Sequence, residues 1–567
     1  MDEDRFIVEQ IANLSYLEGL YQESQQKNQV IEPSLQKFFN DLGQSAILSS
    51  TLSPSEENKI GRLIDAYRRY GHFSASIYSI PHFHRFSMPS FLDLNQLGFQ
   101  EQDLSTVFKT YGLLEKTTAS LQEIIDCLNK RYCHTVGFEF TDIRDHSLKQ
   151  WIQEQIESGY FDQSFSPDDR LQIAESLMRT ELLENFLHTK YVGKKRFSLE
   201  GGEALIPMLL FFVAQAAEEG IEKICFGMAH RGRTSVLAHV LKRPLSEVFK
   251  DFDEEIEPSS GAGTGDMRYH KGYLSSESLT NKGKNIQLSV SSNPSHLESV
   301  DTVVEGQTKA YQIAEKDEEA RKRVLSFLIH GDAALSGQGI VYELLQLNKL
   351  KGYETGGTIH VVINNQVGFT ATPLEGRSTF YCTDIARAFD IPIFHINSDD
   401  PEICVRTLLF ALEIRQRFQS DVFIDLNCYR KYGHNEGDEP DFTHPADYRY
   451  IRQKKTPRQL YIDLIEQNQF FDTQAIRDLE QTIKKDYLTI YEEIKANSSN
   501  LLSLPSYQKF DFQPVSTAVS LELLFKISQT LATFPSHLHL HTKLEKLIKD
   551  RQKKNKIRCL VPFLFAR

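Results

Sequence analysis

The chain has 567 residues and a formal net charge of −13, with 40% hydrophobic, 25% charged and 11% aromatic residues. At about 150 residues per domain, this length predicts about three or four domains, and the composition is that of a globular protein. The acidic charge argues against a general nucleic-acid binder, which needs a basic face. No nucleic-acid partner is therefore expected.

The cysteines and the apolar stretches predict a cytoplasmic protein. Seven cysteines are scattered without a CxxC pair, which favours reduced thiols over a disulfide framework or a cysteine zinc site. The amino terminus, MDEDRFIVEQ, lacks the apolar region of a signal peptide. The longest apolar stretch, ALIPMLLFFVA at 204–214, is too short to span a bilayer and contains Pro207. No membrane partner is expected.

The pattern of apolar residues changes along the chain. After a short helical piece and a polar connector, helical patterns dominate from about 55 to 185, with apolar residues at i, i+3, i+4 and i+7. After about 190, apolar β-type runs alternate with helical patterns; the runs are KICFGMA, NIQLSVSSN, VLSFLIHG, TIHVVINN, IPIFHIN and DVFIDLNC. This alternation predicts an α/β fold, a doubly wound parallel sheet with helices on both faces. Residues 455–550 return to helical patterns.

The stretch HGDAALSGQGIVYELLQLNKL, residues 330–350, carries an unexpected carboxylate. The apolar run VLSFLI leads into Gly331 and Asp332, at the tip of a buried strand and just before a helix expected to start near Gln338. In parallel sheets ligands bind at the carboxyl ends of strands. A cation at this point is therefore expected.

The next strand supplies a second oxygen ligand. TIHVVINN ends in Asn364 and Asn365, so adjacent parallel strands bring Asn365 beside Asp332. A carboxylate and an amide oxygen suit Mg²⁺, which completes its octahedron with water and phosphate oxygens. A helix amino terminus nearby favours the same anion. The alternative for each piece alone is structural: Asp332 as a helix cap, and the two asparagines as a turn.

The spacing of these pieces resembles the thiamine diphosphate motif, which begins with Gly-Asp and ends in Asn-Asn; here Asn365 follows Asp332 by 33 positions. Six further segments occur in order: RFSLEGGEALIP, GMAHRGRTSVLAHVL, GTGDMRYHKGY, NPSHLESVDTVVEGQ, INNQVGFTATP and CYRKYGHNEGDEP. Together they resemble the decarboxylating first component of 2-oxoglutarate dehydrogenase, from SYLEGLYQE near the amino terminus to about residue 552.

The resemblance implies a thiamine-diphosphate-binding fold and roles for particular residues. Mg²⁺ would be held by Asp332, Asn365 and the backbone carbonyl of Val367. The cofactor would also contact Arg231, Ser295, Leu297, Ala333, Ala334 and His434. His230 and His270 would be catalytic and face the reacting carbons, and His270 would also bind the substrate carboxylates. Histidines suit this task because they exchange donor and proton-transfer roles near neutral pH.

The resemblance also implies a division of the chain. Residues 1–45 would be a docking segment, 46–188 a helical domain and 189–450 the α/β domain that binds the diphosphate. Residues 451–552 would be a helical linker region and 553–567 an aberrant tail. The family continues into a pyrimidine-binding domain with an activating glutamate and then a third domain; we expect both to be absent here.

The implied activity is oxidative decarboxylation of 2-oxoglutarate with succinyl transfer to lipoamide, in the tricarboxylic acid cycle. The implied partner is the lipoyl-bearing dihydrolipoyl succinyltransferase, and a homodimer is expected. The alternatives are an inactive truncated remnant, a module that docks on the acyltransferase, or one half of a split 2-oxoacid dehydrogenase.

Several other features have plainer interpretations. His82 and His84 in PHFHRF lie in a loop without acidic partners, so a metal pair there is not expected. GAGTG at 261–265 lacks the strand and glycine spacing of a dinucleotide fingerprint and is interpreted as a substrate-side loop. His296 is either a packing or a catalytic residue, and the basic run at 549–558 is interpreted as a solvated helix end.

Overall fold

The computed structural model describes residues 56–80, 90–253, 268–275, 285–471, 473–497, 516–535 and 537–554. Several predicted features lie outside these residues: the expected docking segment, His82, His84, the GAGTG loop and residues 555–567 of the tail. The chain divides into two units, Met1–Lys495 and Ala496–Arg567. In the second unit the described helices are α19 (Leu521–Leu531) and α20 (Thr542–Lys554).

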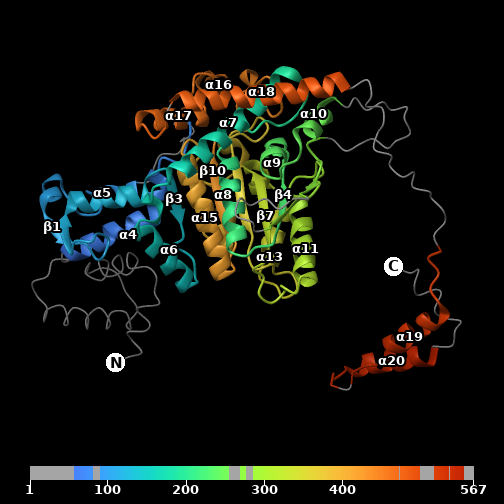
Figure 1. The fold of residues 1–567 in the computed structure, drawn as a ribbon. Helices are drawn as coiled ribbons and strands as arrows, with labels where there is room; N and C mark the ends of the chain where they lie inside the picture. Colours follow the sequence, from blue (N-terminus) through green and yellow to red (C-terminus); the bar gives the residue numbers. More distant parts are fainter. Residues whose placement is uncertain are drawn as a thin grey trace, which may run out of the picture. The chain divides into compact units, whose positions relative to one another are not determined.

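An eight-stranded sheet forms the centre of the first unit (Figure 1), in the order β3-β9-β10-β8-β7-β4-β6-β5. Its six inner strands pair in parallel, whereas β3 and β5 pair antiparallel at the two edges. The bounds are β3 (Val136–Glu139), β4 (Lys223–Met228), β5 (Tyr273–Leu274), β6 (Gln287–Val290), β7 (Val324–Gly331), β8 (Ile359–Asn364), β9 (Ile393–Asn397) and β10 (Val422–Asn427). The expected α/β class is confirmed, with a mixed, mostly parallel sheet.

Helices cover both faces because the inner strands are apolar on both sides. One face packs against α7 (Pro167–Lys190), α8 (Leu205–Glu218) and α15 (Pro401–Phe418). The other face packs against α11 (Ser299–Ala314), α12 (Asp332–Gly337), α13 (Gly339–Leu347) and the 3-10 helix η5 (Asp384–Phe389). Along β7, Phe327 faces the first layer and Leu328 the second. The continuous apolar runs that predicted buried strands thus follow from burial on both sides.

The segment before the main sheet is joined to it through an edge strand. It contains α4 (Glu56–Ser74), α5 (Leu121–Tyr132), α6 (His146–Ser158) and the short pair β1 (Val107–Lys109) and β2 (Thr118–Ser120), with η2 (Ser90–Leu92), η3 (Glu101–Ser105) and η4 (Tyr160–Asp162). Helix α4 packs against β3, which pairs with β9. Residues expected to be helical therefore contribute a strand to the main sheet.

The remaining helices complete the first unit. They are α9 (Arg233–His239), α10 (Leu245–Asp253), α14 (Pro373–Gly376), η6 (Pro440–Phe442), α16 (Pro445–Ile451), α17 (Pro457–Gln467) and α18 (Thr473–Asn497). Helix α17 packs on α7 (Figure 1). None of the described helices is long and apolar enough to cross a membrane.

Phe410 on α15 joins the early helical segment to the sheet. It is fully buried, and its ring lies 5.1 Å from Trp151, 4.9 Å from Tyr160 and 5.5 Å from Phe394, measured between centroids. We expect Phe410→Ala to lower the free energy of unfolding by about 3–5 kcal/mol, because it leaves a cavity at this junction. The shift is measured by urea unfolding.

The matched control is Phe442→Ala, because Phe442 is 87% exposed. That change should stay within about 0.5 kcal/mol of the parent. Equal effects of the two substitutions would contradict the assignment of Phe410 to a packed junction.

Candidate active site

Three neighbouring strands place the predicted residues at the carboxyl ends of the parallel strands. In the parallel register Met228 of β4 pairs with Ile329 of β7, and Gly331 of β7 pairs with Ile363 of β8. The segments that follow these strands therefore leave the sheet at the same end. His230 and Asn365 follow β4 and β8, and Asp332 begins α12 directly after β7.

Asp332 is the first residue of α12 and is 4% exposed. Burial raises the pKa of its carboxyl group, against the attraction of Arg377, whose Nη1 lies 3.9 Å from Oδ2. A short helix begins here, because an aspartate suits the first turn. Gln338 has an extended backbone that ends α12 and caps α13, so the helix expected to start near Gln338 is confirmed, and the short helix before it was not expected.

The loop after β8 packs directly on the start of α12. A Cβ atom on Gly368 would lie 2.5 Å from the Cβ atom of Ala333, so a side chain at position 368 has no room. The side-chain oxygen of Asn365 accepts the N–H of Val367 at 3.3 Å. The two halves of the predicted metal motif, which are separate in the sequence, are thus brought together. Ala333 is exposed and Ala334 half-buried.

Arg430, which follows β10, forms hydrogen bonds with the loop after β8. The sequence had suggested no role for this residue. It donates to the carbonyl of Phe369 at 3.1 and 3.2 Å, and more weakly to that of Val367 at 3.5 Å. The carbonyl expected to bind Mg²⁺ therefore has a competing donor. An arginine directly after a buried strand, in CYRKYGHNE, was the available signal.

His230 and His270, which were both predicted to be catalytic, lie side by side. Their ring centroids are 4.9 Å apart, and Ser295 Oγ lies 3.2 Å from Nε2 of His270. Burial, followed by the neighbouring His270, lowers the pKa of His230 to about 4. His230 is therefore neutral at pH 7 and suited to accept a proton or hydrogen bond. Leu297 is 47% exposed near this group.

Arg231 connects the loop after β4 with the loop that carries His434. Its guanidinium donates to the backbone carbonyls of Ser198 and His434, both at 2.9 Å. Burial lowers the pKa of Arg231 to about 10, and burial followed by Arg231 lowers the pKa of His434 to about 4. In this structure Arg231 thus has a loop-fixing role beside the cofactor contact that was predicted.

Glu436 was missed as an organising residue, although it lies in the GHNE motif. Its carboxylate accepts the backbone N–H groups of Arg196 and Ser198 at 2.8 Å, and that of Phe197 at 3.2 Å. Phe197 then packs between His230 and His434, at centroid distances of 5.1 and 5.4 Å. The segment 196–198 and the loop 434–438 are therefore fixed to each other, which positions both histidines.

Comparison with known proteins agrees with this geometry. The sequence profile of the family described as Dehydrogenase E1 component matches residues 175–500. The 2-oxoglutarate dehydrogenase E1 component of Bacillus subtilis is 34% identical over 572 residues, covering 95% of this chain and 60% of that protein. The E1 component of Cupriavidus necator is 38% identical, covering 88% and 54%, and the multifunctional 2-oxoglutarate metabolism enzyme of Mycolicibacterium vanbaalenii is 38% identical, covering 88% and 41%.

An α/β sheet with polar loops gathered at the carboxyl ends of its parallel strands defines a cofactor-binding enzyme domain. The chain belongs to the dehydrogenase E1 component family. Enzymes of this family depend on thiamine diphosphate. The chain spans about half the length of the curated relatives it matches.

The pKa of His230 can be tested directly. In protein labelled with ¹³C-histidine, the His230 resonance should titrate with a midpoint near 4, because burial disfavours the imidazolium form. The resonance is assigned by its disappearance in His230→Asn. A midpoint near the ordinary value of about 6.5 would contradict the neutral assignment.

Proposed function

We propose that this chain binds thiamine diphosphate with Mg²⁺ at the carboxyl ends of β7 and β8. The observation that supports the proposal is the close approach of Gly368 to Ala333, which packs the loop containing Asn365 against the start of α12 at Asp332. The donor set would be the Asp332 carboxylate, the Asn365 amide oxygen and the Val367 carbonyl. These hard oxygen ligands fit Mg²⁺, which keeps its remaining positions for water and phosphate oxygens.

The fit is supported by the electrostatics of Asp332. Among the described residues, Arg377 forms an ion pair with its carboxylate at 3.9 Å, which is beyond hydrogen-bond distance. A buried carboxylate with only this long ion pair is costly, and a bound metal ion would offset that cost. Ala333 and Ala334 would lie beside the diphosphate, with Arg231, Ser295, Leu297 and His434 as further contacts.

We propose decarboxylation of 2-oxoglutarate as the activity. Bound thiamine diphosphate supplies a thiazolium ring that stabilises the negative charge left when carbon dioxide departs. His270 would bind the substrate carboxylates, with its ring oriented by Ser295. His230, neutral at pH 7, would exchange a hydrogen bond or proton near the reacting carbons.

The similarity to 2-oxoglutarate dehydrogenase E1 components also supports a proposal about the assembly. We propose that the succinyl group passes to the lipoyl group of a dihydrolipoyl succinyltransferase, within the tricarboxylic acid cycle. A homodimer and a cytoplasmic location complete the proposal, and the scattered cysteines of the sequence favour the latter.

Asp332→Asn tests the cofactor site. Calorimetric titration with thiamine diphosphate and Mg²⁺ should show at least about 100-fold weaker binding, because the substitution removes the charged metal ligand. Asp126→Asn is the matched control, since Asp126 is exposed on α5. Equal affinity of Asp332→Asn and the parent would overturn the assignment.

His270→Asn tests the substrate role. Release of labelled carbon dioxide from 2-oxoglutarate should fall by about 100-fold in kcat/KM, while thiamine diphosphate affinity stays within about threefold. His146→Asn, on the exposed start of α6, should leave both values unchanged. A loss of cofactor affinity equal to the loss of activity would count against a substrate role.

The chain spans about half of its relatives, so activity is measured on the chain alone and with the unmatched part of the Bacillus subtilis relative added. Decarboxylation by the chain alone supports a self-sufficient enzyme. Decarboxylation only after the addition supports one half of a split enzyme. Cofactor binding without decarboxylation in either case would reduce the proposal to a cofactor-binding or docking module.

A further inference from the structure

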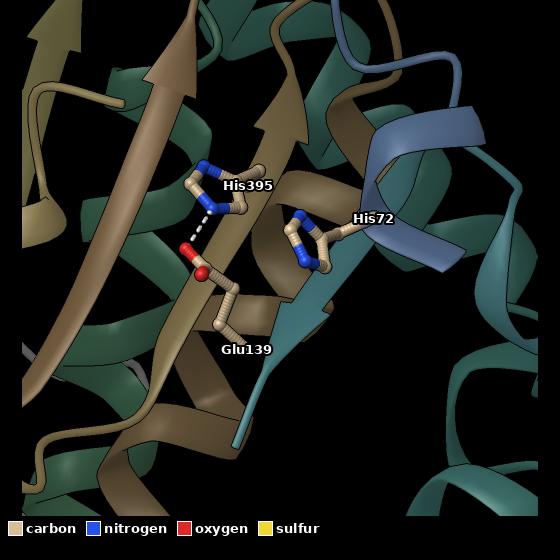
Figure 2. Close-up of side chains that lie close together, drawn as sticks. All are labelled: His72, Glu139 and His395. Carbon is tan, nitrogen blue, oxygen red and sulfur yellow. Dashed lines mark hydrogen bonds and ion pairs between the residues drawn. The ribbon is translucent and has the colours of Figure 1, made fainter. Parts of the chain in front are cut away.

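A second group of potential metal ligands lies at the lateral edge of the sheet formed by β3 and β9. His72 comes from α4, Glu139 from the end of β3 and His395 from β9, and one ligand atom from each lies within 4.8 Å of the others. Figure 2 shows the two imidazole rings and the carboxylate converging. Nε2 of His395 is 2.8 Å from Oε1 of Glu139.

The chemistry of these donors is that of a zinc site. Two imidazoles and one carboxylate are a common set of three protein ligands for Zn²⁺, with a fourth position left for water. Metal-binding histidines usually donate their other ring nitrogen to a carboxylate or another oxygen. Here Nδ1 of His395 is 2.7 Å from Asp425, and Nδ1 of His72 is 2.9 Å from the Tyr381 hydroxyl. Nε2 of His395 is hydrogen-bonded to the proposed co-ligand Glu139, so a bound ion would replace the proton of that bond.

The charge around the cluster favours a cation. Arg387 contacts Glu139, Asp142 and Asp384, and His395 contacts Glu139 and Asp425. Four carboxylates therefore face two cationic groups when His395 is protonated, which leaves an excess of negative charge. A divalent ion that replaces the Nε2 proton of His395 would reduce that excess, as metal binding displaces protons from its ligands.

The ligands are held in place before any ion binds. A Cβ atom on Gly137 would lie 2.9 Å from the Cβ atom of His72, so the glycine lets α4 approach β3 closely at this point. His72 is 4% exposed, and its ring is held by the Tyr381 hydroxyl, 2.9 Å from Nδ1. Preset ligands bind a metal with little loss of conformational freedom.

The site is accessible from a cavity of about 280 Å³. His72, Glu139 and Arg387 line it, together with the aromatic ring of Phe73. The cavity offers space for a water molecule as the fourth ligand and a path for the ion.

We propose that His72, Glu139 and His395 form a binding site for a divalent transition-metal ion of the zinc class. It is separate from the Asp332 site in both residues and ligand chemistry, since nitrogen donors favour Zn²⁺ over Mg²⁺. The bound ion cross-links α4, β3 and β9, and so fixes the early helical segment to the edge of the sheet.

The test uses the full chain, stripped of metal by a chelator and kept free of thiamine diphosphate. Zn²⁺ is titrated by calorimetry, and Co²⁺ is used as a spectroscopic probe of tetrahedral coordination. We expect one Zn²⁺ per chain and a higher Tm with Zn²⁺. Binding should weaken by at least about 100-fold in His72→Asn and in the near-isosteric Glu139→Gln.

The matched controls are His146→Asn and Glu154→Gln, both exposed on α6. They should bind Zn²⁺ like the parent, and so should Asp332→Asn, which separates this site from the proposed cofactor site. The inference is overturned if the parent binds no Zn²⁺, if His72→Asn and Glu139→Gln bind it unchanged, or if Asp332→Asn abolishes binding.

Discussion

Parallel pairing of β4, β7, β8 and β10 is the constraint on which the candidate active site depends. Each of these strands is almost entirely buried, because helices cover both faces of the sheet. Because the strands run in the same direction and are in register, the four segments that follow them begin at the same end of the sheet. Residues far apart in the sequence then meet without any dedicated scaffold. A slip in register between β7 and β8 would separate Asp332 from Asn365.

The loops themselves are fixed by charged side chains that bond to backbone rather than to one another. Arg231 donates to two carbonyls, Arg430 to the carbonyls of the loop after β8, and Glu436 accepts three N–H groups. Such bonds satisfy backbone groups that irregular segments would otherwise leave unpaired. They also make the positions of His230 and His434 depend on ion–dipole contacts that are stronger than neutral hydrogen bonds.

A row of buried polar side chains crosses four neighbouring strands on one face of the sheet. Nδ2 of Asn364 donates to Asp425 at 2.8 Å, Asp425 bonds His395, and His395 bonds Glu139 on the edge strand. Asn364 precedes the proposed metal ligand Asn365. The row therefore runs from the proposed zinc site to Asn364, the sequence neighbour of a residue of the proposed cofactor site.

The sequence by itself determined the fold class, the strand β7 and the chemistry expected at its end, because apolar runs and polar strand ends are local patterns. It placed a helix start near Gln338, where α13 begins, but it did not predict the short helix α12, which starts at Asp332 and packs against the loop at Gly368. It assigned no role to Arg430, and it gave no indication of the cluster of Glu139 and His395, which are 256 positions apart. Only the tertiary structure brings these residues together, because edge-strand pairing and the close approach of α4 at Gly137 are long-range contacts without a local pattern.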